Sequence, residues 1–464
     1  MMARSSRQEA PKSKANNEGH SKRPSDGRYS WANVTIRSCQ REDAIFSKWD
    51  RVREDILRRI DLTHVSMIGC YRVGTKGSSR KARPTIFIFG NHHKHPKSVQ
   101  PARNIINDVL KKHNVAEIEV EFLEGRQRRH SSDTESEEDG PKPKRDIEES
   151  GGAFRPDVVR LRSLPGQSLA LKENISCSGT FGGFFEIILP GIAKPKVVGI
   201  TCFHVINPTE KNKMDIVRDR IRQWRKKGIK PNDTGASDLT VDHPSPRVVQ
   251  EKTRSLGKKL RKGDEMMYLE AKQRLSDCER LLHDIQMFNP GFGKVWAASG
   301  FRTGQAPSIN SGNHTLPTNY DWALIEVPHE RVGRNTTPGG HILKQSPLPK
   351  SLDNLTLCIS GQRSGYSEGD YNALKETNID HEMVDGKTVS MPTIEHSVIP
   401  RGDSTSFGRH GDSGALVYTK DTHVVVGLFF SGRVHPPFTS SFTHISDLIA
   451  DIKSTTGAME VRLF

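Results

Sequence analysis

The sequence from Phe407 to Tyr418 is FGRHGDSGALVY, in which glycines flank a short turn that leads into an apolar strand. Glycine adopts backbone conformations that other residues avoid, so such a turn can project the Ser413 hydroxyl into a cleft. The backbone amides of Gly411 and Ser413 then point the same way and form an oxyanion hole, which stabilises the charge that develops on an attacked carbonyl. Gly-Asp-Ser-Gly also occurs in ordinary turns, so it indicates nucleophilic catalysis only if partner residues occur elsewhere in the chain.

Two such partners precede the turn, each at one end of a predicted strand. His204 follows VVGITCF, residues 197–203, whose length and β-branched content indicate a buried strand. Asp321 begins DWALIEV, residues 321–327, which indicates a second apolar strand. Taken singly, the three residues could be a core histidine, a strand cap and a turn serine. Their order along the chain, with each at a strand edge, favours a catalytic set over three unrelated residues.

In this order and context, His204, Asp321 and Ser413 resemble the catalytic residues of the trypsin/chymotrypsin-like serine peptidases. The resemblance covers roughly residues 170–464 outside an insertion, and the layout is most similar to the intracellular trypsin-like peptidases of filamentous fungi. It implies a mainly β fold of two antiparallel β-barrels with the catalytic residues at their junction. It also implies that His204 is the general base, that Asp321 orients it, and that Ser413 is the nucleophile.

The same resemblance implies that Phe407 lies at the base of the substrate pocket. It also implies that one wall of the pocket is formed by Phe430, Ser431 and Gly432. A phenyl ring at the base has no charge to bind Lys or Arg, so we expect small or apolar side chains before the scissile bond. Asp412 matches an acid that pairs with a new N-terminus in relatives activated by cleavage. A long N-terminal region is attached here, so we expect a different partner for Asp412.

Composition limits the classes of partner. The 464 residues allow two or three domains, and with 33% hydrophobic and 27% charged residues we expect part of the chain to stay outside a packed core. The net charge of +15 favours acidic partners, including nucleic acid, although no basic stretch interleaved with aromatic residues supports a nucleic-acid binder. No apolar run is long enough to span a membrane, so no membrane association is expected.

Cysteine usage favours a reducing, intracellular setting, either cytoplasmic or nuclear. No cysteine lies near Ser413, and Cys202 precedes His204 where secreted relatives place a cysteine after the histidine. The N-terminus also lacks the apolar core of a signal peptide. The cysteines are Cys39, Cys70, Cys177, Cys202, Cys278 and Cys358.

A small α+β domain is predicted over residues 29–126, between a disordered basic tail (1–28) and a disordered charged linker (127–155). Its predicted elements are a helix over 45–60, strands over 65–73 and 84–89, a helix at about 101–113 and a strand over 118–122. The basic loop 74–83 could bind phosphate, but it lacks a P-loop ending, which favours a surface loop.

Two further features of this region carry weaker indications. His92, His93 and His95 could ligate a metal, but no acidic or thiol partner lies nearby in the sequence, so no metal site is expected. In the linker, Ser132, Thr134 and Ser136 lie among acidic residues and are candidates for phosphorylation. An exposed linker is also open to cleavage, which suggests that the enzyme cuts its own linker.

The peptidase part, residues 156–464, contains a helical insertion at about 207–290. Apolar spacing predicts helices over 214–228 and 268–290, joined by polar, turn-rich residues at 229–246. These helices either form an antiparallel pair packed on the first barrel or serve as an arm that docks a partner.

The sequence therefore predicts a serine endopeptidase that acts on protein or peptide substrates through an acyl-enzyme, with no cofactor and no metal. The alternative is a catalytically silent, peptidase-like interaction protein. Its basic surface and helical insertion would engage acidic partners.

Overall fold

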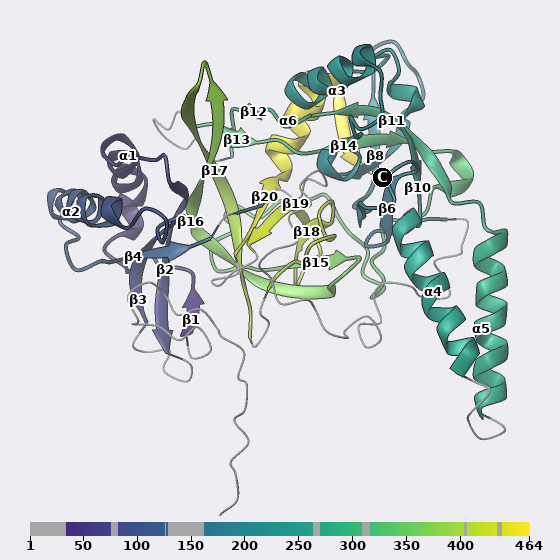
Figure 1. Cartoon of the computed structure of the whole chain (residues 1–464), viewed down its shortest axis with the longest axis horizontal. Coiled ribbons are helices and arrows are strands. Elements are labelled where there is room, and N and C mark those ends of the chain that lie inside the picture. The colour runs from purple at the N-terminus through teal and green to yellow at the C-terminus, as the bar shows by residue number, and fades with distance from the viewer. Residues whose placement is uncertain are drawn as a thin grey trace, which may run out of the picture.

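The computed structural model describes residues 34–75, 82–125, 127–128, 162–262, 270–308, 316–402, 406–433 and 439–464 (Figure 1). The predicted tail 1–28 and nearly all of the linker 127–155, with Ser132, Thr134 and Ser136, lie outside these residues. Disorder, phosphorylation and self-cleavage in those segments therefore stay predictions. No helix among the described residues is long and apolar enough to cross a membrane.

The first sheet forms from the strands that surround His204 and Asp321. The predicted strands at 197–203 and 321–327 are confirmed as β9 and β14, which are neighbours, with Ala323 opposite Thr201. The sheet order is β21 (Glu460–Leu463), β8 (Gly183–Ile188), β9 (Lys196–Thr201), β14 (Ala323–Glu326), β11 (Gly291–Ala298), β10 (Thr240–Asp242), β6 (Ser168–Leu171) and β7 (Gly179–Thr180).

The second sheet carries the Ser413 turn between two of its strands. Its order is β15 (Thr356–Gly361), β18 (Leu416–Thr419), β19 (Val425–Arg433), β20 (Ser440–His444), β17 (Lys387–Pro400), β16 (Gly365–Val384), β2 (Val65–Thr75), β3 (Arg83–Gly90) and β4 (Glu119–Glu124). Two short strands join its sides, β1 (Val34–Arg37) on β2 and β5 (Gln127–Arg128) on β19.

Because β15 also pairs with β16, the strands from β15 to β16 in this order close into a ring. The structure is mainly β, in agreement with the sequence. The finer prediction of two barrels stays a prediction, since such a closing pair occurs in one sheet only among the described residues.

The N-terminal module, residues 34–125 as far as they are described, contains the predicted helices and strands in the predicted order, with β1 as an unpredicted strand before them. Helices α1 (Trp49–Arg59) and α2 (Pro96–Lys112) pack on β2, β3 and β4 around a shared apolar core (Figure 1). Helix α2 begins earlier than predicted, because proline is tolerated in the first turn of a helix, where its missing N–H is not needed. The module shares a sheet with the ring, since Ile68 and Met67 of β2 pair with Thr377 and Asn378 of β16.

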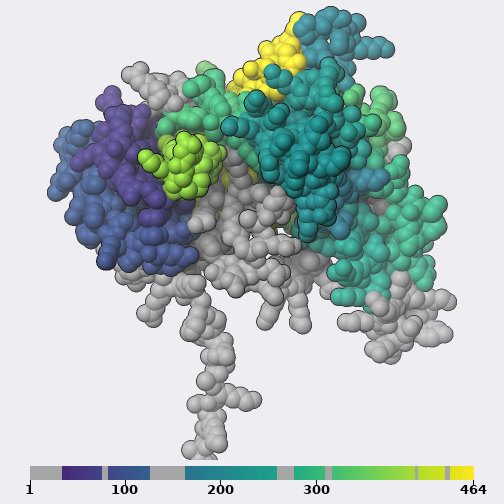
Figure 2. Space-filling model, turned by 45° about the horizontal axis from the view of Figure 1, so that its top comes forward, coloured from purple at the N-terminus to yellow at the C-terminus, as the bar shows by residue number. Residues whose placement is uncertain are grey.

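The long β16–β17 hairpin extends beyond the ring and lies against the module. Figure 2 shows its yellow-green tip beside the purple α1 region. At the C-terminus, helix α6 (Ile445–Thr456) crosses back toward the first sheet, where Leu448 and Ile452 enter its core and β21 pairs with β8. The chain end therefore ties the two sheets together.

The insertion is helical, but of its two predicted arrangements the antiparallel pairing of helices 214–228 and 268–290 is wrong. The helices are α3 (Asp215–Lys227), α4 (Pro246–Lys262) and α5 (Glu270–Met287), and α5 packs against α4 rather than α3 (Figure 1). The segment 229–246, predicted as a polar connection, contains β10 of the first sheet, and Ile229 bridges to Ala298. The sequence missed α4 because its many lysines and arginines hide a narrow apolar stripe formed by Val248 and Leu256.

Candidate active site

The end of strand β9 places His204 beside Asp321. After Thr201 the chain enters a short helical turn, Phe203–Val205, which buries the imidazole of His204. The Nδ1 atom of His204 lies 2.6 Å from Oδ2 of Asp321, and the His204 backbone amide donates to Oδ1 at 3.0 Å. A carboxylate only accepts hydrogen bonds, so Nδ1 carries the proton and Nε2 is left as the basic atom.

A second set of contacts fixes the segment that carries Asp321. The indole of Trp322 donates to Oδ2 of Asp451 on α6 at 2.7 Å, and Arg302 binds both oxygens of the same carboxylate at 2.7 and 2.6 Å. The Trp322 amide also donates to Oγ of Ser299 at 2.8 Å. These bonds fix Trp322, the residue that directly follows Asp321, so they help to hold the carboxylate toward His204.

The Ser413 turn packs directly on the first sheet. Gly411 and Gly414 have φ angles of +103° and +97°, which favour glycine. A Cβ atom at Gly414 would lie 2.3 Å from the carbonyl of Thr180 and 2.3 Å from Oγ1 of Thr201, so no larger residue fits. Strand β9 therefore touches the Ser413 turn at Thr201 and presents His204 three residues later. The structure brings the three predicted catalytic residues to one junction between the sheets.

Cys202 lies between the His204–Asp321 pair and the Ser413 turn. Its Sγ atom donates to the Phe429 carbonyl at 3.2 Å, and the Gly414 amide donates to the same oxygen at 2.9 Å. Burial raises the pKa of the Cys202 thiol well above its usual value, and the nearby Asp321 carboxylate adds to the effect. The thiol therefore stays protonated and acts as a packing and hydrogen-bonding group.

The hydroxyl of Ser413 donates to the carbonyl of Phe430 at 3.2 Å. Both Ser413 and His204 belong to the described residues, and no hydrogen bond joins them. Catalytic hydrogen bonds are often formed only when substrate binds, and Oγ moves by rotation about a single bond. His204 is thus bonded to Asp321, while the Ser413 hydroxyl is bonded to a neighbouring carbonyl.

The amides predicted to form the oxyanion hole are not consumed by the fold. In the turn, the Asp412 amide donates to the Arg409 carbonyl at 2.9 Å and the Gly414 amide donates to Phe429. The amides of Gly411 and Ser413, by contrast, have no acceptor among the described residues. Within the described part of the chain, these two amides are therefore left as unused donors.

Asp412 is held by the protein itself, as expected from the sequence. Its Oδ1 accepts from the amides of Arg363 at 2.7 Å and Ser364 at 3.1 Å. Its Oδ2 accepts from the Ser364 hydroxyl at 2.5 Å and from the Arg409 amide at 2.8 Å. Three main-chain amides and one hydroxyl therefore satisfy the carboxylate without any chain terminus.

Thr180 is a residue of this junction that the sequence reasoning missed. Its amide donates to the Ser413 carbonyl at 2.8 Å, and its hydroxyl donates to the Gly411 carbonyl at 3.0 Å. The same hydroxyl accepts from the Gln362 amide at 3.0 Å. One threonine of the first sheet thus fixes both sides of the nucleophile turn. Its only sequence signal is its position beside Gly179 in a glycine-rich pair of strands.

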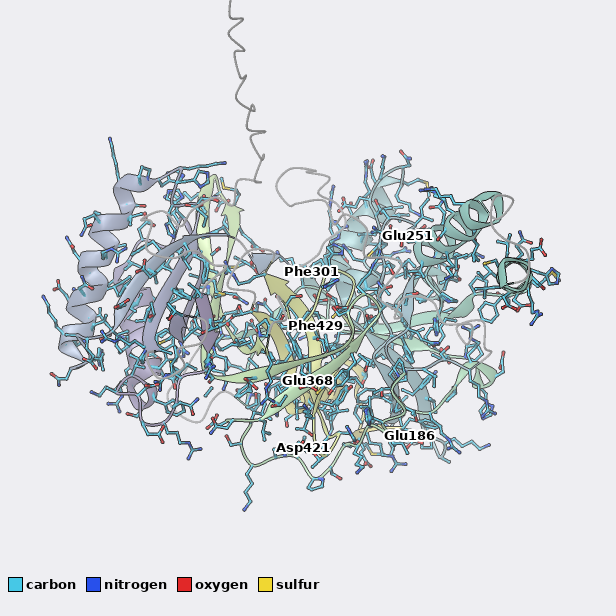
Figure 3. The ribbon with its side chains drawn as sticks, turned by 90° about the horizontal axis from the view of Figure 1, so that it is seen from below. Glu186, Glu251, Phe301, Glu368, Asp421 and Phe429 are labelled. Carbon is cyan, nitrogen blue, oxygen red and sulfur yellow. The ribbon has the colours of Figure 1, made fainter. Side chains whose placement is uncertain are left out.

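The predicted pocket residues divide into two groups. Phe430, Ser431 and Gly432 lie on β19 next to the Ser413 turn, as the Ser413–Phe430 bond shows. Phe407 is fully buried, and its ring meets the edge of Phe429 at a centroid distance of 6.2 Å (Figure 3 labels Phe429). Phe407 thus contributes to the core of the second sheet, and the size of the primary pocket stays a prediction.

The only cluster of described side chains with spacing that could suit a metal is Cys202, His204 and Asp321. The 2.6 Å between Nδ1 and Oδ2 is a hydrogen-bond distance, so a shared proton occupies that space. These residues therefore suit proton transfer better than metal binding. In the N-terminal module, His93 binds Glu124 at 2.6 Å and His92 binds the Ile88 carbonyl at 3.0 Å, so their ring nitrogens serve separate contacts.

No protein-family model matches the sequence, and no curated protein matches it. Solved structures to which the chain is similar include a glutamic acid-specific serine protease in which a histidine triad takes part in substrate binding. It shares 11% identity over 65% of this chain and 100% of its own, with a TM-score of 0.32. Thermobifida fusca protease A shares 10% identity over 65% of this chain and 97% of its own, with a TM-score of 0.29. Nocardiopsis protease shares 10% identity over 65% of this chain and 97% of its own, with a TM-score of 0.30.

These similar structures are trypsin/chymotrypsin-like serine proteases. The two-barrel arrangement stays a prediction. The finer resemblance to the fungal intracellular peptidases also stays a prediction. The chemical function of the site is therefore inferred from the contacts of His204, Asp321 and Ser413.

Proposed function

We propose that this protein is a serine endopeptidase that hydrolyses peptide bonds through an acyl-enzyme formed on Ser413. The observation that carries the proposal is the buried His204–Asp321 pair, joined at 2.6 Å and 3.0 Å beside the Gly411–Gly414 turn. A buried imidazole with one nitrogen bound by a carboxylate and the other left basic is suited to general-base catalysis.

The proposed reaction begins when Ser413 leaves the Phe430 carbonyl and turns toward Nε2 of His204. Giving up one such hydrogen bond costs about 1 kcal/mol, a small part of a catalytic barrier. His204 takes the hydroxyl proton as Oγ attacks the substrate carbonyl, while the amides of Gly411 and Ser413 stabilise the oxyanion. His204 then gives the proton to the leaving amine, and water repeats the sequence to release the acyl group.

Asp321 acts in this scheme by orienting His204 and stabilising the imidazolium that forms during attack. The steps require no metal and no cofactor. We propose an intracellular setting on the basis of the cysteines, which are all free thiols in the structure. Cleavage of the linker at 127–155 by the enzyme itself belongs to the same proposal.

The proposal is tested by labelling the full-length protein with a fluorophosphonate probe. We expect labelling of the wild type and none of Ser413→Ala, and we expect Ser413→Ala to lower peptide cleavage by more than about 10⁴-fold. Ser351→Ala, an exposed loop serine, is the matched control and should label as the wild type does. Equal labelling of wild type and Ser413→Ala, or no labelling of folded wild type, would overturn the proposal.

One observation favours a second candidate, a peptidase-like interaction protein without catalysis. The hydroxyl of Ser413 bonds to Phe430 rather than to His204, which is an arrangement that a silent site would also show. In that case the basic surface and the α4–α5 pair would engage acidic proteins or nucleic acid. An unlabelled wild type that binds duplex DNA or an acidic peptide with strong salt dependence would support this candidate.

A further inference from the structure

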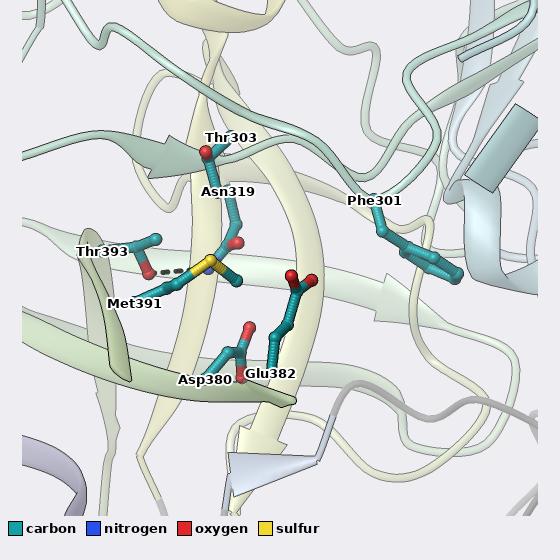
Figure 4. A pocket seen from close by; sticks show the side chains of 7 residues that line it. All are labelled: Phe301, Thr303, Asn319, Asp380, Glu382, Met391 and Thr393. Carbon is teal, nitrogen blue, oxygen red and sulfur yellow. Dashed lines mark hydrogen bonds between the residues drawn. The ribbon is translucent and has the colours of Figure 1, made fainter. Parts of the chain in front are cut away.

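A hollow of about 310 Å³ lies between the β16–β17 hairpin and the segment that precedes Asp321 (Figure 4). Its walls combine two kinds of surface. Phe301 and Met391 provide apolar surface, while Asp380, Glu382 and Asn319 provide oxygen atoms. The size is near the lower end of ligand pockets, about 300 Å³, and suits one long side chain.

The alternation of strand β16 turns two carboxylates toward this hollow. Successive side chains of a strand point to opposite faces, so Asp380 and Glu382 share one face and His381 takes the other. His381 lies 2.9 Å from the Val65 carbonyl of the N-terminal module. The module therefore fixes the outer face of the hairpin, while the exposed carboxylates of Asp380 and Glu382 face the hollow (Figure 4).

Asn319 supplies a buried acceptor at the inner wall. Its Nδ2 donates to Oγ1 of Thr393 at 2.7 Å and to Oε1 of Glu395 at 2.7 Å. Because the Glu395 carboxylate accepts and does not donate, the amide cannot be turned around, and its oxygen must be Oδ1. Asn319 is 2% exposed, and this oxygen has no hydrogen-bond partner among the described residues. A buried acceptor without a donor is costly, which points to a donor from outside the chain.

The hollow also lies next to the proposed catalytic residues. Asn319 precedes Asp321 by two residues, a span of roughly 7 Å in extended chain. On the other wall, the ring of Phe301 packs edge to face on Phe203, with centroids 5.0 Å apart, and Phe203 precedes His204. The hollow is therefore connected to His204 and to Asp321 through lining residues that contact or lie near each of them.

We propose that this hollow binds the ammonium or guanidinium group of a Lys or Arg side chain of the peptide substrate, at a position other than the residue before the scissile bond. The proposal rests on the peptidase function argued above. The hollow offers acceptors and negative charge, and its apolar walls suit the aliphatic stem of such a side chain. A metal ion fits less well, because Asp380 and Glu382 belong to no cluster with metal-ligand spacing in the described part of the chain.

The test compares wild type with the double variant Asp380→Asn/Glu382→Gln. Internally quenched peptide libraries carry Lys, Arg, norleucine or Glu at each position around the cleaved bond, and rates are normalised to the fluorophosphonate-labelled fraction. We expect the wild type to prefer Lys or Arg over norleucine by about 10-fold in kcat/KM at one position beyond the first. The double variant should lose that preference and cut Lys, Arg and norleucine peptides at similar rates.

Asp385→Asn is the matched control, since Asp385 lies at the turn of the same hairpin and does not line the hollow. It should keep the preference. Wild type that is labelled and active but shows no such preference, or a double variant that keeps it, overturns the assignment of the hollow and leaves the peptidase proposal intact.

A second measurement tests whether the hollow binds a cationic side chain, even if no peptide is cut. Fluorescein-labelled hexapeptide pools with Lys or norleucine fixed at one position are titrated into Ser413→Ala protein and followed by anisotropy. Tighter binding of at least one Lys pool, abolished by Asp380→Asn/Glu382→Gln, supports cation binding. Equal affinities for all pools overturn it. Absence of both labelling and cleavage overturns the peptidase function separately.

Discussion

The N-terminal module and the α4–α5 pair are both additions to the part of the chain that carries the site, but they are attached in different ways. The module joins through buried groups of the second sheet. The Tyr71 hydroxyl lies 2.5 Å from Oε1 of Glu376, the Trp49 indole donates to the Lys375 carbonyl at 2.9 Å, and the Arg433 guanidinium stacks 3.3 Å from the Phe89 ring centre. All three contacts are made by buried groups, where the loss of one partner costs more than it does at the surface.

The α4–α5 pair joins through surface groups. Glu251 of α4, visible at the right of Figure 3, forms an ion pair of 3.4 Å with Arg363, which lies outside the helical pair. These side chains are partly exposed, and exposed ion pairs contribute little stability. The difference suggests that the module is a structural support for the β16–β17 hairpin, whereas the helical pair can be altered without loss of the fold.

The largest effect is expected from Trp49→Ala. The side chain is buried in the module core and bonded to β16, so we expect a loss of about 3–5 kcal/mol in the free energy of unfolding. Leu256→Ala is the counterpart in α4, where we expect less than about 1 kcal/mol in the main unfolding transition because the pair can open locally. Urea unfolding followed by circular dichroism measures both. Similar losses of unfolding free energy in the two variants would show that the module and the α4–α5 pair do not differ in how strongly they are attached.

A pH dependence is expected on the module side. Burial raises the pKa of Glu376 above its usual value of 4.5, so the folded state favours the neutral acid. The stability that this group contributes is complete below pH 4.5 and is lost as the pH rises through the folded pKa. Each unit of separation between the folded and unfolded pKa is worth about 1.4 kcal/mol.

Glu376→Gln removes this titration. The stability of the wild type minus that of the variant should therefore fall as the pH rises from 4 toward 8 in urea unfolding experiments. A difference that stays constant or grows over this range would show that Glu376 is ionised in the folded protein.

The smallest effect is expected from Glu251→Gln. Arg363, its partner, donates its backbone amide to Asp412 in the Ser413 turn, so the change should lower kcat/KM about 2- to 5-fold with little change in stability. Glu279→Gln, an exposed glutamate on α5, is the matched control and should have no effect. If both variants match the wild type in kinetic assays, the helical pair has no influence on the turn.

The sequence predicted the parts of the molecule that depend on local pattern. Apolar β-branched runs located β9 and β14, and the resemblance to the trypsin-like peptidases implied the contact of His204 with Asp321. It did not predict β10, because three residues are too few to show alternation. It also missed the bonds of Thr180 to the Ser413 turn and the orphan oxygen of Asn319. These features depend on which distant strands become neighbours, and no local signal carries that information.

The contacts of Asp412 bear on how such an enzyme would be controlled. Its donors come from residues 363, 364 and 409, which are all set once the chain has folded. No severed peptide bond is required to shape the turn, so a freshly synthesised molecule would already be competent. Restraint would then have to come from outside the turn, through an inhibitor, through scarcity of suitable substrates, or through rapid turnover of the protein.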